Sequence, residues 1–532
     1  MKTPCDEMAI EAGSAAVPCA EAEPWILVVA ILGSSMAFID STVVNVALPA
    51  IQSGLGGTVT DMQWVVESYA LLLSALILTG GASGDVFGRR RMFLLGVSVF
   101  VTASVACGLA GNIRELVIAR AVQGLGAAFL VPGSLSIISA SFSESKRGRA
   151  IGTWSGFTAI TTAAGPVLGG WLIQHASWRW AFFLNVPIAT AVIALTLRWV
   201  PESRAEKKGE EIDWMGALLA TAGLTGVTYG FIESSSRNWT NAAVGGALLA
   251  GGACLVGFWY AEKRSGSPMV PFDLFRSANF SGGNLLTFFL YAALGIFFFL
   301  FPLNLIQVQH YSATATGAAA LPFILLMFLL SRWSGGLVAR FGAKRPLVIG
   351  PLIAAIGFLC FSIPSTGGSY WRTFFPGFVV LGLGMAVTVA PLTTAVMGAA
   401  SRNRAGTASG INNAVARVAG LLAIAVLGMV MLGLFSHYLN GHVGALGLPD
   451  EMLRAVKLSE IKLAATTVPD GLNAAAAAKL GGMIAAAFVF GFRTILLICA
   501  GLSVVSSGFA WWMLRENDPK HTGMASVQPN TD

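Results

Sequence analysis

The stretch GGASGDVFGRRRMF, residues 80–93, places a cluster of charged side chains between two long apolar segments. Asp85 and the run Arg89–Arg91 fall within seven residues. Arginines beside an apolar segment are typical of the short cytoplasmic loops of membrane proteins. Anchoring of this kind explains the arginines but not Asp85, because an acid at the C-terminal end of a helix meets the negative end of the helix dipole. Asp85 therefore needs a partner, which we expect to be Arg89 or the N-terminus of a neighbouring helix. With Gly81 and Gly88 allowing a close approach, Asp85, Arg89 and Arg90 would form a latch between helices that closes in one conformation and opens in another, a role in conformational gating. Anchoring of the loop alone is the alternative.

The composition of the whole chain indicates an integral membrane protein. Of the 532 residues, 55% are hydrophobic and 11% are charged, whereas soluble domains carry about 25% charged residues. The 62 glycines favour a closely packed bundle, because small residues let membrane helices approach one another. The net charge of +7 lies mainly in short loops between apolar segments, so it indicates membrane topology and not a nucleic-acid partner. The predicted fold class is therefore all-α integral membrane.

Apolar segments of spanning length recur along the chain. A helix needs about 20 largely apolar residues to cross the bilayer. Placing both termini in the cytoplasm puts most Lys and Arg residues in cytoplasmic loops, as the positive-inside rule requires, and an odd number of spans would break this alternation. We expect fourteen spans, at residues 25–50, 62–83, 92–111, 113–138, 150–174, 179–200, 213–232, 241–261, 280–307, 315–338, 345–363, 371–396, 407–434 and 488–514.

Charged linkers divide these spans into groups of six, two and six. The linkers follow the sixth and eighth spans, at residues 201–212 and 262–279. The stretch SGGLVARFGAKR, residues 334–345, echoes the opening stretch, with Ala339 in place of Asp85, and this echo favours an internal duplication. The expected parts are a cytoplasmic tail at 1–24, a six-helix bundle at 25–200, two inserted spans at 201–270, a second six-helix bundle at 271–514 with an extracytoplasmic loop at 435–487, and a cytoplasmic tail at 515–532.

A set of motifs resembles one known family. Gly81, Asp85, Gly88, Arg89 and Arg90 fill the pattern GxxxDxxGRR, which is similar to the loop signature of the major facilitator superfamily. The stretch RAVQG (120–124) resembles the membrane arginine motif of the superfamily. Further stretches resemble its fourteen-helix drug:proton antiporter branch, which is of the multidrug efflux type: IDSTVVNVALP (39–49), WRWAFFLNVP (178–187), DWMG (213–216) and GTASGINNAVARVAG (406–420). The resemblance implies the major facilitator fold, with two six-helix bundles around a central cavity and two inserted spans. Such bundles rock to expose the cavity to each side in turn.

The fifth expected span carries the pattern that the resemblance assigns to antiporters. Gly152, Gly165, Pro166, Gly169 and Gly170 fill it, while Thr161 stands where the family has glycine. Residues spaced by four form one face for close helix packing, and Pro166 favours a kink. Ordinary packing is the alternative interpretation. In the family this motif marks exporters, so the resemblance implies export.

Charged residues are rare inside the expected spans, where a charge costs roughly 2.5–3.5 kcal/mol on insertion scales, and Asp40, Glu67 and Arg120 are the main functional candidates among them. Asp40 lies near the middle of the first span; it either couples protons or contacts substrate, or it makes a structural hydrogen bond. Glu67 is a second candidate proton or cation site, with solvation at the outer end of its span as the alternative. Arg120 needs a partner, which is Asp40, Glu67 or free backbone carbonyls. The resemblance assigns Arg120 to proton coupling, with a static structural pair as the alternative. Arg332 and Arg417 are weaker candidates, structural or snorkelling.

These observations predict a proton-coupled exporter of amphipathic drugs or metabolites in the cell's inner membrane. Its partners would be protons, a small-molecule substrate and the bilayer, with one chain sufficient and a periplasmic adaptor left open. A proton-driven importer is the close rival, and a membrane-embedded enzyme or sensor is a third hypothesis. The sequence holds no Walker-type phosphate loop and no metal-spaced His/Cys cluster, so neither ATP-driven pumping nor a bound cofactor is indicated.

Overall fold

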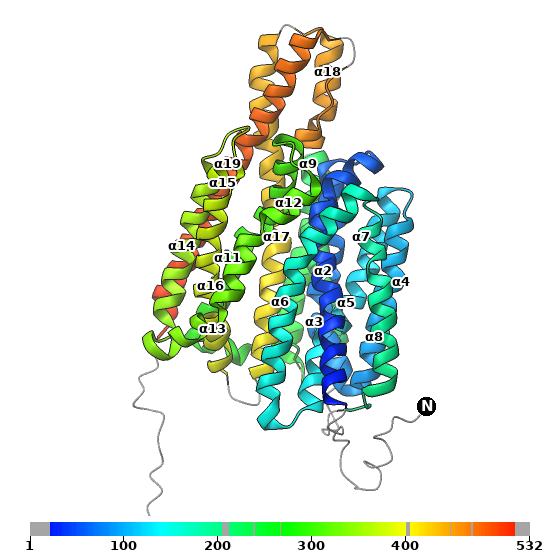
Figure 1. Ribbon diagram of the computed structural model, residues 1–532, viewed down its shortest axis with the longest axis vertical. Coiled ribbons are helices and arrows are strands. Elements are labelled where there is room, and N and C mark those ends of the chain that lie inside the picture. Colours follow the sequence, from blue (N-terminus) through cyan, green and yellow to red (C-terminus); the bar gives the residue numbers. More distant parts are fainter. Residues whose placement is uncertain are drawn as a thin grey trace, which may run out of the picture.

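The computed structural model describes residues 22–204, 212–237, 240–266, 268–400, 405–446, 448–469 and 472–515. Within these ranges the secondary structure is helical throughout (Figure 1). The start of α2 (Glu23–Leu55) and the end of α19 (Ala474–Met513) lie at the same end of a helical bundle. A pair of long helices projects from the opposite end, with α18 (Asp450–Ser459) beside it.

The remaining helices follow one another up and down the bundle. In the first part of the chain they are α3 (Val59–Phe87), α4 (Arg89–Leu109), α5 (Ile113–Ser141), α6 (Glu144–His175), α7 (Trp180–Phe183), α8 (Asn185–Trp199), α9 (Trp214–Arg237) and α10 (Ala242–Arg264). In the second part they are η1 (Phe272–Arg276), α11 (Ala278–Leu303), η2 (Asn304–Val308), α12 (Ala313–Ala319), α13 (Leu321–Phe341), α14 (Lys344–Ser362), α15 (Tyr370–Thr373), α16 (Phe375–Gly398), α17 (Ala405–Val443), η4 (Gly444–Leu446) and η5 (Glu460–Ala465).

Helices occupy the positions of all fourteen expected spans. Thirteen of those in the described ranges are long and apolar enough to cross a membrane. The remaining position belongs to α6, which has 32 residues and covers the expected span 150–174; several of its side chains lie outside the described part. Four expected spans are not single α-helices: α7 precedes α8, η2 ends α11, α12 is separated from α13 at Ala320, and α15 is separated from α16 at Phe374.

Two groups of helices pack against each other along a seam. Helices α2–α8, the first half, pack mainly among themselves, as do helices α11–α19, the second half. The two halves meet at the seam, where α3 packs on α17 and α6 packs on α12. The inserted helix α9 packs against α10 and also covers the seam, because it contacts both α3 and α17. On α10 large apolar side chains such as Leu249 and Val256 are largely exposed, as expected for a helix that faces lipid.

The segment 435–487 is helical over much of its length, where the sequence analysis expects a long loop. Helix α17 continues to Val443, and α19 starts at Ala474. The Asn473 side chain caps α19 by accepting a hydrogen bond from the Ala476 amide at 2.7 Å. A run of alanines follows this cap, and alanine has the strongest intrinsic helix preference. The alanine run therefore starts α19, and the extensions of α17 and α19 form the projecting pair, a helical hairpin.

The base of this helical hairpin contains a buried acid, Glu460, which is 8% exposed. Its Oε2 accepts a hydrogen bond from Asn440 at 3.2 Å, while Oε1 has no partner in the described part of the chain. Burial raises the pKa of Glu460 above its ordinary value, and hydrogen bonds from Ser436 and Asn440 only partly oppose this shift. An acid whose pKa is higher in the folded state than in the unfolded state binds its proton more tightly when the protein is folded. As the pH rises above the unfolded-state pKa, the folded state therefore loses stability relative to the unfolded state.

We therefore expect Glu460→Gln to raise the melting temperature by about 1–3 °C near neutral pH and to leave it unchanged near pH 4. Thermal unfolding at both pH values measures this. Glu451→Gln is the control, because Glu451 is exposed on the neighbouring α18. An equal increase at both pH values would show that loss of the charge is not the cause.

Candidate functional site

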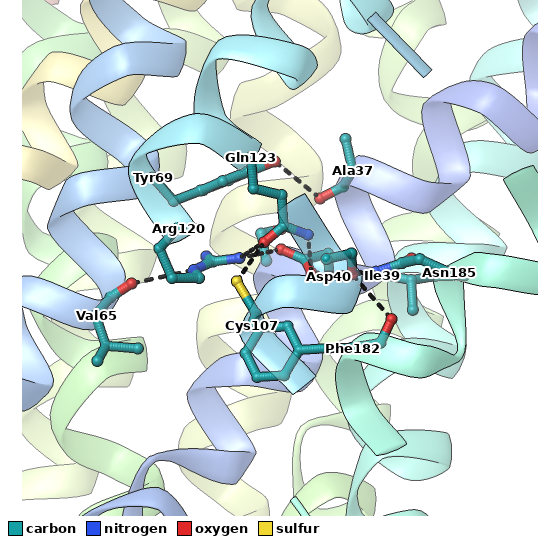
Figure 2. Close-up of polar contacts among 12 residues, drawn as sticks. Ala37, Ile39, Asp40, Val65, Tyr69, Cys107, Arg120, Gln123, Phe182 and Asn185 are labelled. Carbon is teal, nitrogen blue, oxygen red and sulfur yellow. Dashed lines mark hydrogen bonds and ion pairs between the residues drawn. The ribbon is translucent and has the colours of Figure 1, made fainter. Parts of the chain in front are cut away.

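An ion pair lies buried in the first half of the molecule, where α2 packs on α5. Arg120 Nη1 donates to Asp40 Oδ2 at 2.5 Å, and both side chains are at most 1% exposed. Of the partners expected for Arg120, the structure therefore selects Asp40 (Figure 2). It also selects a backbone carbonyl, because Arg120 Nε donates to the Val65 oxygen on α3 at 3.1 Å. This pair ties three helices together at one point.

Polar side chains complete the coordination of Asp40. Gln123 Nε2 donates to Asp40 Oδ1 at 2.8 Å, while Gln123 Oε1 accepts from Arg120 Nη1 at 2.8 Å. Asn185, at the start of α8, donates to Asp40 Oδ1 at 3.3 Å and to Ser104 Oγ at 3.0 Å. The sequence analysis does not single out Gln123 or Asn185, although both lie in the quoted motifs RAVQG and WRWAFFLNVP. A polar residue inside a membrane span is the signal that would have identified them.

Aromatic rings cover the guanidinium group. The Arg120 Cζ atom lies 4.2 Å from the centre of the Tyr69 ring and 5.9 Å from that of Phe182. A desolvated cation gains from the negative face of such a ring. Because the charge of Arg120 is matched by Asp40, and both are held by further hydrogen bonds, this network contains no uncompensated charge.

Glu67 is different, because its carboxyl group has no hydrogen-bond partner among the described residues. The residue is 0% exposed, and neither Oε1 nor Oε2 has a hydrogen-bond partner within the described residues. The alternative that Glu67 is solvated at the end of its span is therefore wrong: the neighbouring helices exclude water from it. Glu67 does not join the network of Asp40 and Arg120.

The position of Glu67 along α3 places it at the seam between the two halves. Residues four apart share a helix face, so Glu67 lies between Gln63 and Leu71. Gln63 Nε2 donates to the Ile424 carbonyl of α17 at 2.8 Å. Leu71 belongs to an apolar cluster that includes Leu421 of α17. The carboxyl group of Glu67 is thus held on the face of α3 that packs against the second half.

The two weaker arginine candidates give less information. Arg417 lies on α17, four residues before Leu421 on the same seam, and makes no ion pair in the described part of the chain. The side chain of Arg332 lies outside the described residues, so its expected role stays a prediction.

The glycine stripe of α6 packs closely against α2. Thr161 Oγ1 lies 3.0 Å from Ser35 Oγ, so the threonine that replaces glycine forms a polar contact between these helices. A Cβ atom added at Gly165 would meet Thr42 and Ile39, and one added at Gly169 would meet Val43. The expected smooth face is therefore present. It serves the contact of α6 with α2 within one half.

The same helix also meets the second half. A Cβ atom added at Gly170 would collide with the backbone of Ala313 on α12, and one added at Gly317 on α12 would collide with the Pro166 carbonyl. This close approach forms part of the seam. Gly152 takes no part in either contact, because no atom of the described residues lies within 4 Å of a Cβ atom added there.

At the hairpin end, side-chain hydrogen bonds join the two halves. Gln307 of η2 donates to Gln52 Oε1 of α2 at 2.8 Å, and Gln52 donates to the Lys462 carbonyl of η5 at 3.3 Å. Thr314 of α12 donates to Gln174 of α6 at 2.7 Å. In this conformation the first half is therefore tied both to the second half and to the base of the hairpin.

The opening stretch forms a compact polar loop between α3 and α4. Arg89 lies 2.8 Å from Asp85, which confirms the expected partner of this acid. The pair links two helices of the same half. A Cβ atom added at Gly81 would lie 3.5 Å from the Pro132 side chain on α5, so this glycine lies at an ordinary contact.

A residue that the sequence analysis does not identify, Glu202, completes this loop. Its Oε1 accepts a hydrogen bond from the Arg90 amide at 3.1 Å, and its Oε2 lies 3.7 Å from Arg91. The Arg90 guanidinium donates to the Val200 carbonyl at 3.1 Å. The first residues of the charged linker therefore dock on the loop. The charged side chains of residues 85–91 therefore hold together the ends of α3, α4 and α8.

Gly88 allows this docking, because its φ of 111° is a conformation that other residues rarely adopt. A Cβ atom there would lie 2.6 Å from Glu202 Oε1.

We expect Gly88→Ala to destabilise the protein by about 1–3 kcal/mol, measured as a decrease in melting temperature. Gly152→Ala is the matched control and should leave the melting temperature unchanged or slightly higher. Equal effects of the two substitutions would contradict this account of Gly88.

The sequence of this chain is similar to that of a known family and of several characterised proteins. The sequence pattern of the Major Facilitator Superfamily matches residues 30–424. The tetracenomycin C resistance and export protein of Streptomyces glaucescens is 32% identical over 497 residues, which cover 92% of this chain and 91% of the relative. The multidrug resistance protein Stp of Mycobacterium tuberculosis is 34% identical over 507 residues, which cover 90% of each chain.

Solved structures share the fold at low sequence identity. A bacterial homologue of the human lysosomal transporter Spinster superposes with a TM-score of 0.63 at 17% identity, covering 94% of this chain and 99% of the other. A D-xylose-proton symporter gives a TM-score of 0.61 at 15% identity, covering 92% of this chain and 98% of the other. At such identities these likenesses establish the fold alone.

Proposed function

Because this chain belongs to the major facilitator superfamily, a family of membrane transporters, we propose that it exports amphipathic drug-like molecules across the inner membrane in exchange for protons. Relatives about one-third identical over most of their length are named for antibiotic resistance and export. These names support export over import and over a non-transporting sensor or enzyme. The transported class would be small amphipathic molecules, with the proton gradient as the energy source in place of a cofactor.

The observation that carries proton coupling is the unpartnered carboxyl group of Glu67. A buried carboxylate without a counter-ion is costly, and protonation removes that cost. Glu67 lies on the face of α3 that packs on α17, so separation of the halves would give it water and allow it to exchange its proton with the side to which it opens. Asp40 already has a compensating charge in Arg120. We therefore assign proton binding to Glu67, and to the Asp40–Arg120 network the role of fixing α2, α3 and α5 around it.

The proposed cycle is alternating access between two six-helix halves, residues 25–200 and 271–514, with α9 and α10 at the seam. The contacts of Gln52 with Gln307 and with the Lys462 carbonyl would break when the hairpin end opens. We propose that this end faces the outside and that both termini face the cytoplasm, as the distribution of Lys and Arg favours. Opening at the hairpin end would release the drug and admit a proton to Glu67. The pair of Asp85 and Arg89 would hold the loop of the first half in shape during this movement.

Transport in proteoliposomes with an imposed pH gradient tests this function. The probes are lipophilic cations such as ethidium and tetraphenylphosphonium, followed by neutral and anionic amphiphiles. We expect movement of probe against protons, abolished by collapse of the gradient. Movement of probe in the same direction as protons would identify an importer. Failure of every probe to move, with the protein folded, would contradict the proposal.

A further inference from the structure

The motif DWMG, residues 213–216, brings two acids together at the start of α9. Asp213 caps this helix, because its Oδ1 accepts a hydrogen bond from the Gly216 amide at 2.7 Å. A Cβ atom added at Gly216 would lie 2.9 Å from Asp213 Oδ2 and 2.8 Å from Oε1 of Glu262, which belongs to the last turn of α10. The glycine therefore leaves the space in which the two carboxyl groups converge.

The two converging oxygens are buried, and neither has a hydrogen-bond partner in the described part of the chain. Glu262 is 2% exposed, and its other oxygen, Oε2, accepts a hydrogen bond from the Val270 amide at 3.1 Å. Glu262 is thus fixed on one side to the segment 268–271, which leads into η1, and faces Asp213 on the other. Two carboxylates held this close disfavour each other's charge, so the pair is more stable with one proton than with none.

The neighbouring cations of α10 do not neutralise this pair. Lys263 Nζ lies 3.7 Å from the centre of the Trp259 ring, and Arg264 Cζ lies 4.1 Å from the centre of the Tyr260 ring. Neither cation forms an ion pair with either acid within the described ranges. The charge that acts on Glu262 is instead that of Asp213, which has the same sign.

The elements packed against α9 and α10 bring no counter-ion either. On α9 the charged residues Glu233 and Arg237 lie at the opposite end of the helix and pair with each other. Asp85, at the end of α3, pairs with Arg89. The described residues of the segment 268–271 are Pro-Met-Val-Pro, which carry no charge. A proton is therefore the simplest cation that this space can accept.

The helix ends determine which acid holds the proton. Asp213 lies at the N-terminus of α9, where the helix dipole and the Gly216 amide stabilise a negative charge. Glu262 lies at the C-terminal end of α10, where the dipole has the opposite sign. We propose that Asp213 and Glu262 together bind one proton, which is held on Glu262, and that this proton site joins the start of α9 to the end of α10.

This site is separate from the proton exchange proposed for Glu67, because neither of its acids lies on the face of α3 that packs on α17. It still touches both halves indirectly. The inserted helix α9 contacts α3 and α17, and the Thr79 hydroxyl of α3 donates to the Met269 sulfur in the segment 268–271 at 3.6 Å. Loss of the proton at high pH would place two like charges side by side and loosen α9 from α10.

Thermal unfolding of the full chain in phosphatidylcholine nanodiscs, followed as a function of pH, tests the proposal. The variant is Glu262→Gln, which keeps the shape of the protonated acid and cannot ionise. The folded wild type holds a proton that the unfolded chain releases, so its stability falls as the pH rises. We expect the variant to melt about 1–3 °C above the wild type near pH 8, with a gain that shrinks toward pH 5.

Two further variants keep this test decisive. Asp213→Asn removes the like charge and keeps the cap, so its gain in melting temperature should also grow with pH. Glu451→Gln, at an exposed acid of α18, is the control and should follow the wild type at each pH. A gain in Glu262→Gln and Asp213→Asn that does not change with pH would overturn the proton site.

Infrared spectroscopy gives a direct readout, because a protonated carboxyl group absorbs at a higher frequency than a carboxylate. At pH 7 the wild type and Glu451→Gln should show a band of this kind that Glu262→Gln lacks, and equal bands in all three proteins would overturn the proposal. Stabilisation of the wild type but not of Glu262→Gln by millimolar magnesium would identify a metal site and overturn the assignment to a proton. Neither measurement uses transport, so failure of the proposed export in proteoliposomes would leave this test unaffected.

Discussion

Glu67→Gln is expected to abolish proton-driven export while leaving exchange of substrate across the membrane intact. Glutamine keeps the shape of a protonated glutamate but cannot release a proton, so the halves would still rock around a loaded substrate. The reason is the isolation of Glu67, whose carboxyl oxygens have no partner among the described residues. The two assays are probe movement driven by a pH gradient, which should fall to the level of protein-free vesicles, and counterflow of labelled probe without a gradient, which should persist.

The matched control is Glu233→Gln on α9. Glu233 lies near the same seam, where it accepts a hydrogen bond from Trp64 of α3, but its charge is already paired with Arg237 at 2.9 Å. We expect this variant to keep gradient-driven export. Retention of export in Glu67→Gln would exclude Glu67 as the proton carrier. Loss of both export and counterflow would instead place Glu67 in substrate binding or in the movement of the halves.

The second large effect is on stability. Arg120→Ala should reduce the free energy of unfolding by about 3–5 kcal/mol, because it leaves Asp40 as a buried charge without its counter-ion. Asp40→Asn should destabilise the protein similarly, because Arg120 then remains charged and unpaired. The double variant Asp40→Asn/Arg120→Gln removes both charges, so it should recover most of the loss. The measurement is thermal unfolding followed by a thiol-reactive dye, since Cys107 and Cys499 are buried in the folded protein.

Transport by the double variant separates the roles of the two acids. If Asp40 only positions helices, the double variant should retain proton-driven export once it is folded. If export is lost while counterflow persists, Asp40 takes part in proton coupling, and the assignment to Glu67 alone is wrong. Equal stability of the wild type and both single variants would show that the ion pair contributes nothing measurable to the fold.

The sequence by itself determined the class of this protein. An apolar segment of spanning length is a local property, so counting such segments and the Lys and Arg residues between them predicted helices where the structure has them. The motif around Asp85 and its companions along the chain indicated the family for the same reason, because each is a short stretch read in order. Asp40, Glu67 and Arg120 were found as charges inside apolar segments, without knowledge of their partners.

Only the tertiary structure decided how these charges are used. Asp40 and Arg120 are far apart in the sequence and meet because α2 packs on α5. Glu67 is closer to Asp40 along the chain, yet it has no partner in the part of the chain that the structure describes. The position of a residue along a span gives its depth in the membrane but not which neighbouring helix its side chain meets, and that contact separates the paired acid from the isolated one. The docking of Glu202 beside Gly88, and the helical hairpin where a loop was expected, likewise depend on contacts between distant segments that no local pattern encodes.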